Sequence, residues 1–148
     1  MNRKEVINTL HAAKAAHMQW RARAQALVAG IKVEKDHVPV MYTDCKFGKW
    51  YYGEGQKLSK YPAFKGLEDP HEQLHLVYME IFKHIFGEDQ RSGWAKLFGS
   101  KRSHREQKLA AAEELLPRLV GISQTLLETV DLLEAEINSA SDEELEAL

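Results

Sequence analysis

By residue type and spacing, four side chains could bind one transition-metal ion together: His17, Cys45, His71 and His75. His71 and His75 stand four residues apart in a segment with a helical pattern, so their imidazoles share one face and can converge on one ion. Cys45 is the only cysteine, which excludes an intramolecular disulfide. Three imidazoles and one thiolate would complete a tetrahedral set, and mixed nitrogen and sulfur ligation suits zinc.

Each of these residues also has an ordinary structural interpretation. His17 lies on an otherwise apolar helical face, where a histidine commonly bonds to a backbone carbonyl. A single cysteine such as Cys45 is most often a small buried apolar residue. The pair His71 and His75 would be incidental on a half-exposed helix. The case for zinc therefore depends on all four residues together.

The string from His71 to His75, which reads HEQLH, also matches the pattern of zinc proteases. In such a hydrolase Glu72 would be the general base, and one coordination position would stay open for the attacking water. A closed four-ligand site leaves no such position. We therefore expect no enzymatic activity and keep a zinc hydrolase using His71, Glu72 and His75 as the weaker alternative.

The elements that must position these residues are predicted to be helices. Apolar residues recur at helical spacing in residues 2–30, 68–86 and 104–137, whereas no convincing alternating strand pattern occurs. Prolines and glycines punctuate residues 31–67, which predicts an irregular or short-helix layer with a short helix or turn near Cys45 to Tyr52. We expect a single all-α domain over 1–148, an antiparallel bundle of four to five helices with an irregular segment at about 31–67.

Several finer features follow from local signals. Ser103 and Glu106 resemble a capping box at the start of the last long helix, and Pro117 should kink or break that helix. The acidic residues 138–148 should fray. Residues 88–103 are predicted to be a connection or insertion, in which Trp94, Leu97 and Phe98 would be exposed unless they dock.

Three motifs in order make the sequence similar to the CZB family, the chemoreceptor zinc-binding domains of bacteria. They are His17-Met-Gln-Trp20, then Cys45-Lys-Phe-Gly-Lys-Trp50, then His71-Glu-Gln-Leu-His75. The resemblance covers roughly residues 10–87, which would be the zinc-binding core, with residues 104–137 as a C-terminal helical extension. It implies a helical bundle, usually dimeric, with Zn²⁺ held by His17, Cys45, His71 and His75.

The remaining motif residues are expected to support the site. Trp20, Gly48 and Trp50 would pack the helices and let the backbone turn beside Cys45. A carboxylate is expected to accept the second N–H of a ligating imidazole, and the candidates are Asp44, Glu68, Asp69 and Glu72. The histidines outside the motifs are read as surface or ordinary structural residues: His11, His37, His84 and His104.

The composition of the chain indicates which classes of binding partner to expect. A formal net charge of -2 gives no strong attraction to nucleic acid or to an anionic membrane, so neither is expected as a partner. The charged N-terminus does not resemble a signal peptide, and no apolar stretch is long enough to span a membrane. We expect a cytoplasmic protein. The initial Met and the acidic tail favour a complete, stand-alone chain.

Three functions remain open. The first is a sensor, in which zinc occupancy or oxidation of Cys45, for instance by hypochlorous acid as the resemblance implies, alters helix packing and a signalling partner. That partner would be of chemoreceptor or diguanylate cyclase type, and a homodimer is expected. The second is a purely structural zinc domain that mediates dimerisation. The third is the hydrolase.

Overall fold

A computed structural model of the chain describes residues 1–31, 41–87 and 93–148. These residues contain helices and no strand, so the predicted all-α class is confirmed. The elements in chain order are α1 (Arg3–Val28), α2 (Lys46–Tyr52), the 3-10 helix η1 (Glu54–Leu58), α3 (Pro62–Gly66), α4 (Glu68–Phe86), α5 (Gly93–Phe98), α6 (Lys101–Ser139) and α7 (Asp142–Glu146).

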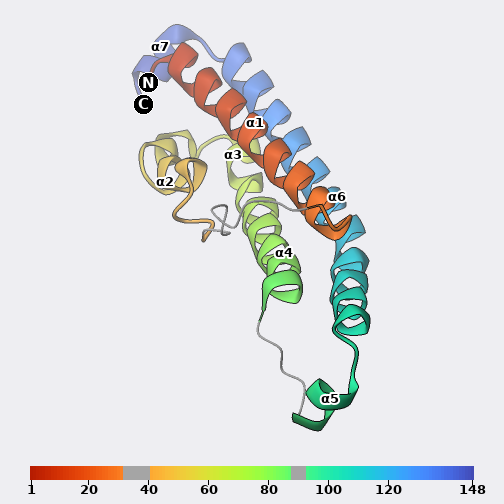
Figure 1. The fold of residues 1–148 in the computed structure, drawn as a ribbon. Helices are drawn as coiled ribbons and strands as arrows, with labels where there is room; N and C mark the ends of the chain where they lie inside the picture. The colour runs from red at the N-terminus through yellow and green to blue at the C-terminus, as the bar shows by residue number, and fades with distance from the viewer. Residues whose placement is uncertain (32–40, 88–92) are drawn as a thin grey trace.

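The long helices α1, α4 and α6 form the bundle (Figure 1). α6 runs antiparallel to both α1 and α4 and packs against each of them, so it is the central support of the fold. Its apolar stripe supplies Leu119, Leu126, Leu133 and Ile137, each almost fully buried. Burial of one such side chain contributes about 1.5–3 kcal/mol, so this shared face accounts for much of the stability.

The region predicted to be irregular contains short helices where it is described. α2, η1 and α3 follow one another between Lys46 and Gly66, and residues 32–40 lie outside the described residues. Five to seven residues are too few for a stable isolated helix, so packing must hold these elements. Tyr51 of α2 stacks on Phe64 of α3 with ring centroids 4.4 Å apart, which ties this layer together.

The boundaries of α4 match the prediction of 68–86. Glu68 and Asp69 lie in its first turn, where negative charge complements the helix dipole. Pro70 is also accepted in that turn, because its missing N–H would have no partner there. The helix ends at Phe86, before Gly87.

One expectation about α6 was wrong, and of the kink or break expected at Pro117 the break is excluded. The helix begins at Lys101 with Ser100 as its cap, and the Ser100 hydroxyl accepts from the N–H of Ser103, so Ser103 is not the capping residue. Pro117 does not break the helix, which continues from Lys101 to Ser139. Pro117 is exposed, so water can solvate the carbonyl that loses its partner, while the buried face of α6 stays packed.

The expectation that residues 138–148 fray was also wrong. They include the end of α6 and the helix α7, which is capped by Ser141, whose hydroxyl accepts from the N–H of Glu144 at 3.1 Å. Arg3 bonds to Asp142 at 2.7 Å, and the N-terminal amino group donates to the carbonyl of Leu145. The Leu145 side chain is 1% exposed. The two ends of the chain therefore meet at one end of the bundle (Figure 1).

Docking of α7 predicts a measurable loss of stability when its anchor is shortened. Leu145→Ala should lower the free energy of unfolding by about 2–4 kcal/mol, because it leaves a cavity in the core. Leu132→Ala is the matched control, since Leu132 is 62% exposed, and it should change stability by less than about 0.5 kcal/mol. Urea unfolding followed by circular dichroism measures both. Equal losses in the two variants would show that α7 is not docked.

Helix α5 lies apart from the bundle core. Trp94, Leu97 and Phe98 are 75%, 79% and 79% exposed, so they do not dock on the bundle. Among the described residues, no helix is both long and apolar enough to cross a membrane.

Candidate metal centre

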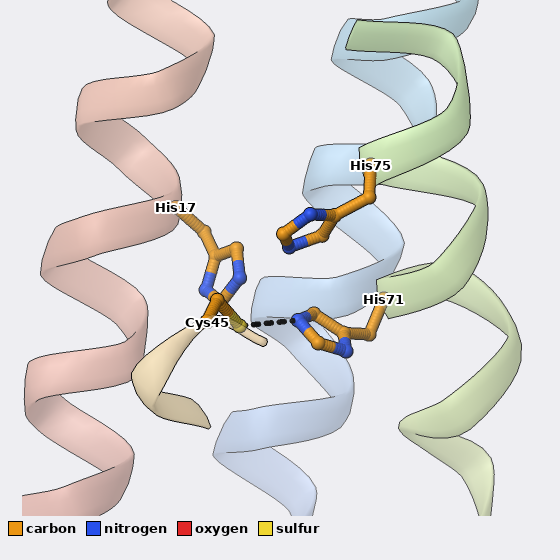
Figure 2. Close-up of side chains that lie close together, drawn as sticks. All are labelled: His17, Cys45, His71 and His75. Carbon is orange, nitrogen blue, oxygen red and sulfur yellow. Dashed lines mark hydrogen bonds between the residues drawn. The ribbon is translucent and has the colours of Figure 1, made fainter. Parts of the chain in front are cut away.

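His17, Cys45, His71 and His75 come together between three helices (Figure 2). His17 extends from α1, Cys45 stands at the start of α2, and the other two project from α4. One potential ligand atom from each residue lies within 4.8 Å of every other. The sequence prediction that these four residues would converge agrees with this geometry.

His17 is fixed by its own helix. Its Nδ1 is 2.7 Å from the carbonyl oxygen of Ala13, one turn earlier, so Nδ1–H donates and Nε2 keeps its lone pair for a ligand. Burial lowers the pKa of His17 to about 4, with the backbone bond to Ala13 opposing the shift and His75 adding to it. The imidazole is therefore neutral at neutral pH, as metal binding requires.

Cys45 has two roles in the fold. It is the N-cap of α2, and its Sγ accepts a hydrogen bond from the N–H of Gly48 at 3.2 Å. The thiol donates to the carbonyl of Tyr42 at 3.4 Å. Burial raises the pKa of the Cys45 thiol, and the N–H groups of Gly48 and Phe47 partly offset that rise. The same sulfur atom thus caps a helix and faces the three imidazoles.

His71 and His75 are almost completely buried, at 2% and 1% exposed. Their ring centroids are 4.7 Å apart, and the His71 ring is 5.0 Å from that of His17. Burial, followed by the neighbouring His17 and His75, lowers the pKa of His71 far below its ordinary value. Clustering of these imidazoles away from water brings ring nitrogens of three histidines close together.

The donor set fits Zn²⁺. Zinc–sulfur and zinc–nitrogen bonds of about 2.3 and 2.0–2.1 Å in a tetrahedron place neighbouring ligand atoms roughly 3.3–3.6 Å apart. The distance from Cys45 Sγ to His71 Nε2 is 3.4 Å, within this range (Figure 2). The upper limit of 4.8 Å for the whole set is wider, so a small contraction would complete the tetrahedron.

The hydrolase alternative finds little support in this geometry. Glu72 does not belong to the group of converging donors, although it lies on α4 between His71 and His75. The fourth direction around the cluster is supplied by Cys45 rather than by open solvent. A catalytic zinc site keeps that position for water, so four convergent protein donors are typical of a closed site.

The ring nitrogen of His17 that faces away from the metal site bonds to a backbone group. A carboxylate was expected in this role, but Ala13 provides the carbonyl for His17, and Glu68 accepts from the hydroxyl of Tyr52 at 2.9 Å. Sequence reasoning missed Ala13, although its place four residues before His17 is a signal that could have found it. None of His11, His84 and His104 belongs to the metal-ligand group, and His37 lies outside the described residues.

Aromatic side chains surround the cluster as the motif predicted. Trp20 packs on His75 and Tyr78, with ring centroids 4.4 and 4.8 Å apart. Trp50 packs on Phe47 and Phe64, with ring centroids 5.7 and 6.1 Å apart, and so supports α2. Phe47, which was not singled out from the sequence, stands edge-on to His71 at 4.9 Å. These contacts fix the directions of the imidazoles.

A cavity of about 440 Å³ opens beside the cluster between α1 and α2. Its lining is mostly apolar and includes both His17 and Cys45, with Trp20 and Trp50 at its walls. Cys45 is only half-buried. Small molecules can therefore approach the sulfur from this side.

Comparison with known proteins agrees with this site. Residues 17–82 match the family model of the chemoreceptor zinc-binding domain, CZB. The match begins at His17 and extends beyond His75, so it includes all four converging residues. Searches of curated proteins and of solved structures gave no match. Residues 17–82 of this chain thus match the chemoreceptor zinc-binding domain family, CZB.

Proposed function

We propose that the chain is a zinc-binding regulatory domain in which His17, Cys45, His71 and His75 hold one Zn²⁺. The observation that carries the proposal is the convergence of three imidazoles and one thiol within 4.8 Å, from three separate helices. The second part of the proposal is that the domain is a sensor. Occupancy of the site, or oxidation of Cys45, changes the packing of α2 on α1 and α4, and a signalling partner responds.

Bound zinc would supply a tetrahedral link between α1, α2 and α4. Different features of the fold orient the four side chains for zinc binding. Ala13 holds His17 in the tautomer with a free Nε2, and the i, i+4 spacing aligns His71 with His75. Cys45 must lose its proton to bind, and its sulfur then still accepts from Gly48.

Cys45 links the state of the site to the position of α2. Hypochlorous acid would transfer its oxygen to the thiolate, so that sulfur loses two electrons, chlorine leaves as chloride and a sulfenic acid forms. The product is a weaker metal ligand and a poorer cap for α2. The cavity that reaches Cys45 provides the route for such an oxidant. Helix α2 has seven residues, so loss of its cap and its anchor would free it first.

Hydrogen exchange can separate a regulatory from a purely structural zinc. Zinc removal by a chelator, or one equivalent of hypochlorous acid, should speed amide exchange in residues 46–52 roughly fivefold or more, since a lost N-cap costs about 1 kcal/mol. Exchange in the buried turns of α4 and α6 should remain slow. The Cys45→Ala variant should show the fast α2 exchange without either treatment.

Other outcomes would contradict this proposal. Unchanged exchange in α2 after zinc removal would exclude a role for zinc in positioning that helix. Collapse of protection throughout the bundle would favour the structural alternative, in which zinc only stabilises the domain and its dimer. In both cases the metal stoichiometry, measured on the same samples, shows whether the binding part of the proposal still holds.

We also propose that the protein is a homodimer in the cytoplasm that acts on a partner of chemoreceptor or diguanylate cyclase type. Support for a dimer comes from α6, where Leu115, Leu116 and Ile122 are only partly buried within one chain. A single cysteine suits a reducing compartment. Light scattering coupled to size exclusion measures the mass of the assembly directly, and a mass of one chain would reject the dimer.

A further inference from the structure

Helix α5 presents a compact apolar surface to solvent. Trp94, Leu97 and Phe98 follow the i, i+3, i+4 spacing of one helical face, and each is at least 75% exposed. The rings of Trp94 and Phe98 stack with centroids 5.5 Å apart. Single exposed apolar residues are ordinary, whereas three large ones gathered on one turn indicate a surface that is covered by something else.

Basic residues lie close to this apolar face along the chain. Between Gly93 and Arg105 the sequence has four lysines and arginines and no acidic residue, although the whole chain has a net charge of -2. We call the exposed group the α5 tip; its members are Trp94, Lys96, Leu97, Phe98, Lys101, Arg102 and Arg105. The tip therefore combines positive charge with apolar side chains on a chain that is slightly acidic overall.

Folding of α6 does not account for these cations. Lys101, Arg102 and Arg105 lie in the first turns of α6, where the positive end of the helix dipole disfavours positive side chains. Arg102 pairs with Glu106 at 3.1 Å, but both side chains are largely exposed, so this pair contributes little. The charges at the tip thus weaken the helix slightly, which points to a role in binding.

The position of the tip suits contact with a flat surface. α5 lies at the far end of the molecule from the two termini and α7, beyond the ends of α1 and α4 (Figure 1). A planar surface can therefore reach α5 without meeting the bundle. The four metal-site residues lie within the bundle, so this feature is independent of the zinc proposal.

We propose that the α5 tip docks on the surface of an anionic lipid bilayer. Trp94, Leu97 and Phe98 enter the interfacial region, where aromatic side chains are favoured, and the surrounding lysines and arginines meet the lipid headgroups. Three apolar side chains on a six-residue helix are too few for a standard protein interface of about 800 Å² per partner. The net charge of -2 for the whole chain led us to expect no membrane contact. The net charge does not reveal that basic residues are concentrated at the α5 tip.

Vesicle sedimentation with the full chain tests the proposal. The protein should bind phosphatidylcholine vesicles that contain about 30 mol% phosphatidylserine and should bind pure phosphatidylcholine far more weakly, because each cation near an anionic surface contributes about 1 kcal/mol, or roughly fivefold. Binding should also shift Trp94 fluorescence to shorter wavelength. Trp94→Phe should abolish that shift and retain binding, since Trp20 and Trp50 lie away from the tip.

Charge reversal is the sharpest variant. Lys101→Glu with Arg105→Glu should weaken binding at least about 25-fold, from two lost cations at roughly fivefold each. Lys57→Glu with Lys65→Glu gives the same change in net charge at exposed positions away from the tip and should bind nearly as wild type. Equal losses in the two double variants would overturn the tip as the binding surface.

The contribution of the apolar side chains of the α5 tip is tested by a separate pair of variants. Leu97→Ser with Phe98→Ser should weaken binding at least tenfold in terms of the vesicle concentration needed, since about 0.8 kcal/mol is lost per buried CH₂. Ile31→Ser with Leu132→Ser alters two other exposed aliphatic residues and should leave binding unchanged. Absence of binding by the wild-type chain, or equal binding to neutral and anionic vesicles, would reject the proposal, and a soluble acidic protein would then become the expected partner.

Discussion

His71→Ala should lower the zinc affinity of the chain at least about 100-fold. Four-ligand zinc sites bind with about 10–16 kcal/mol, so one ligand contributes roughly 3 kcal/mol or more. His71 is also the residue whose Nε2 lies 3.4 Å from Cys45 Sγ, at the spacing of neighbouring zinc ligands. Competition with a fluorescent zinc chelator measures the affinity, and elemental analysis should give one zinc per chain in the wild type.

The controls for this variant must separate lost ligation from lost packing. His11→Ala removes an exposed histidine outside the cluster, which pairs with Glu134, and it should keep wild-type affinity. Cys45→Ala should reproduce the loss seen for His71→Ala. Unfolding of each variant in excess chelator reports the effect on the metal-free fold. An affinity for zinc that is indifferent to both ligand variants would contradict the four-residue site.

Gly48→Ala should disrupt both the fold around α2 and zinc binding. A Cβ at Gly48 would lie 2.9 Å from the carbonyl carbon of Tyr42 and closer still to its oxygen, a distance that real Cβ atoms do not show. These are backbone atoms, so α2 and residues 42–45 must separate, and Cys45 moves with them. We expect a loss of about 2–4 kcal/mol in stability and a zinc affinity at least about tenfold weaker.

Gly121→Ala is the matched control. A Cβ at Gly121 meets no neighbouring atom within 4 Å, and Gly121 lies inside α6. Alanine should therefore stabilise the chain by up to about 1 kcal/mol, because it favours the helix over glycine. Urea unfolding and zinc competition on both variants complete the comparison. If Gly48→Ala were as stable as wild type, the close approach of α2 to Tyr42 would be incorrect.

The sequence allowed accurate prediction where several signals agreed. For α4, an apolar stripe, two acidic residues, an early proline and a terminal Gly87 all indicated one helix, and its bounds are those predicted. The convergence of His17, Cys45, His71 and His75 was predicted from ligand chemistry together with the order of the motifs, and the geometry agrees. In both cases the information is local or carried by residue type.

Prediction from the sequence failed where tertiary contacts determine whether a segment is helical. α7 has five residues and few apolar ones, so it has no periodic pattern, and it is held by burial of Leu145 and by bonds from distant residues such as Arg3 and Lys60. Pro117 is tolerated because its face of α6 is exposed. The exposure of Pro117 and the contact between the two ends of the chain depend on the tertiary fold. Neither can be derived from the residues that are adjacent in sequence.

The arrangement of the bundle also sets an order for its assembly. α4 and α6 follow each other along the chain with only the α5 region between them, whereas α1 meets α6 across nearly the whole sequence. Contacts between near segments form fastest, because closing a longer loop costs more chain entropy. We therefore expect the α4–α6 hairpin to form first and α1 to dock later. Since His17 belongs to α1, the folding chain would first bring His71 and His75 together without His17, and the set of four donors would be complete only after α1 docks.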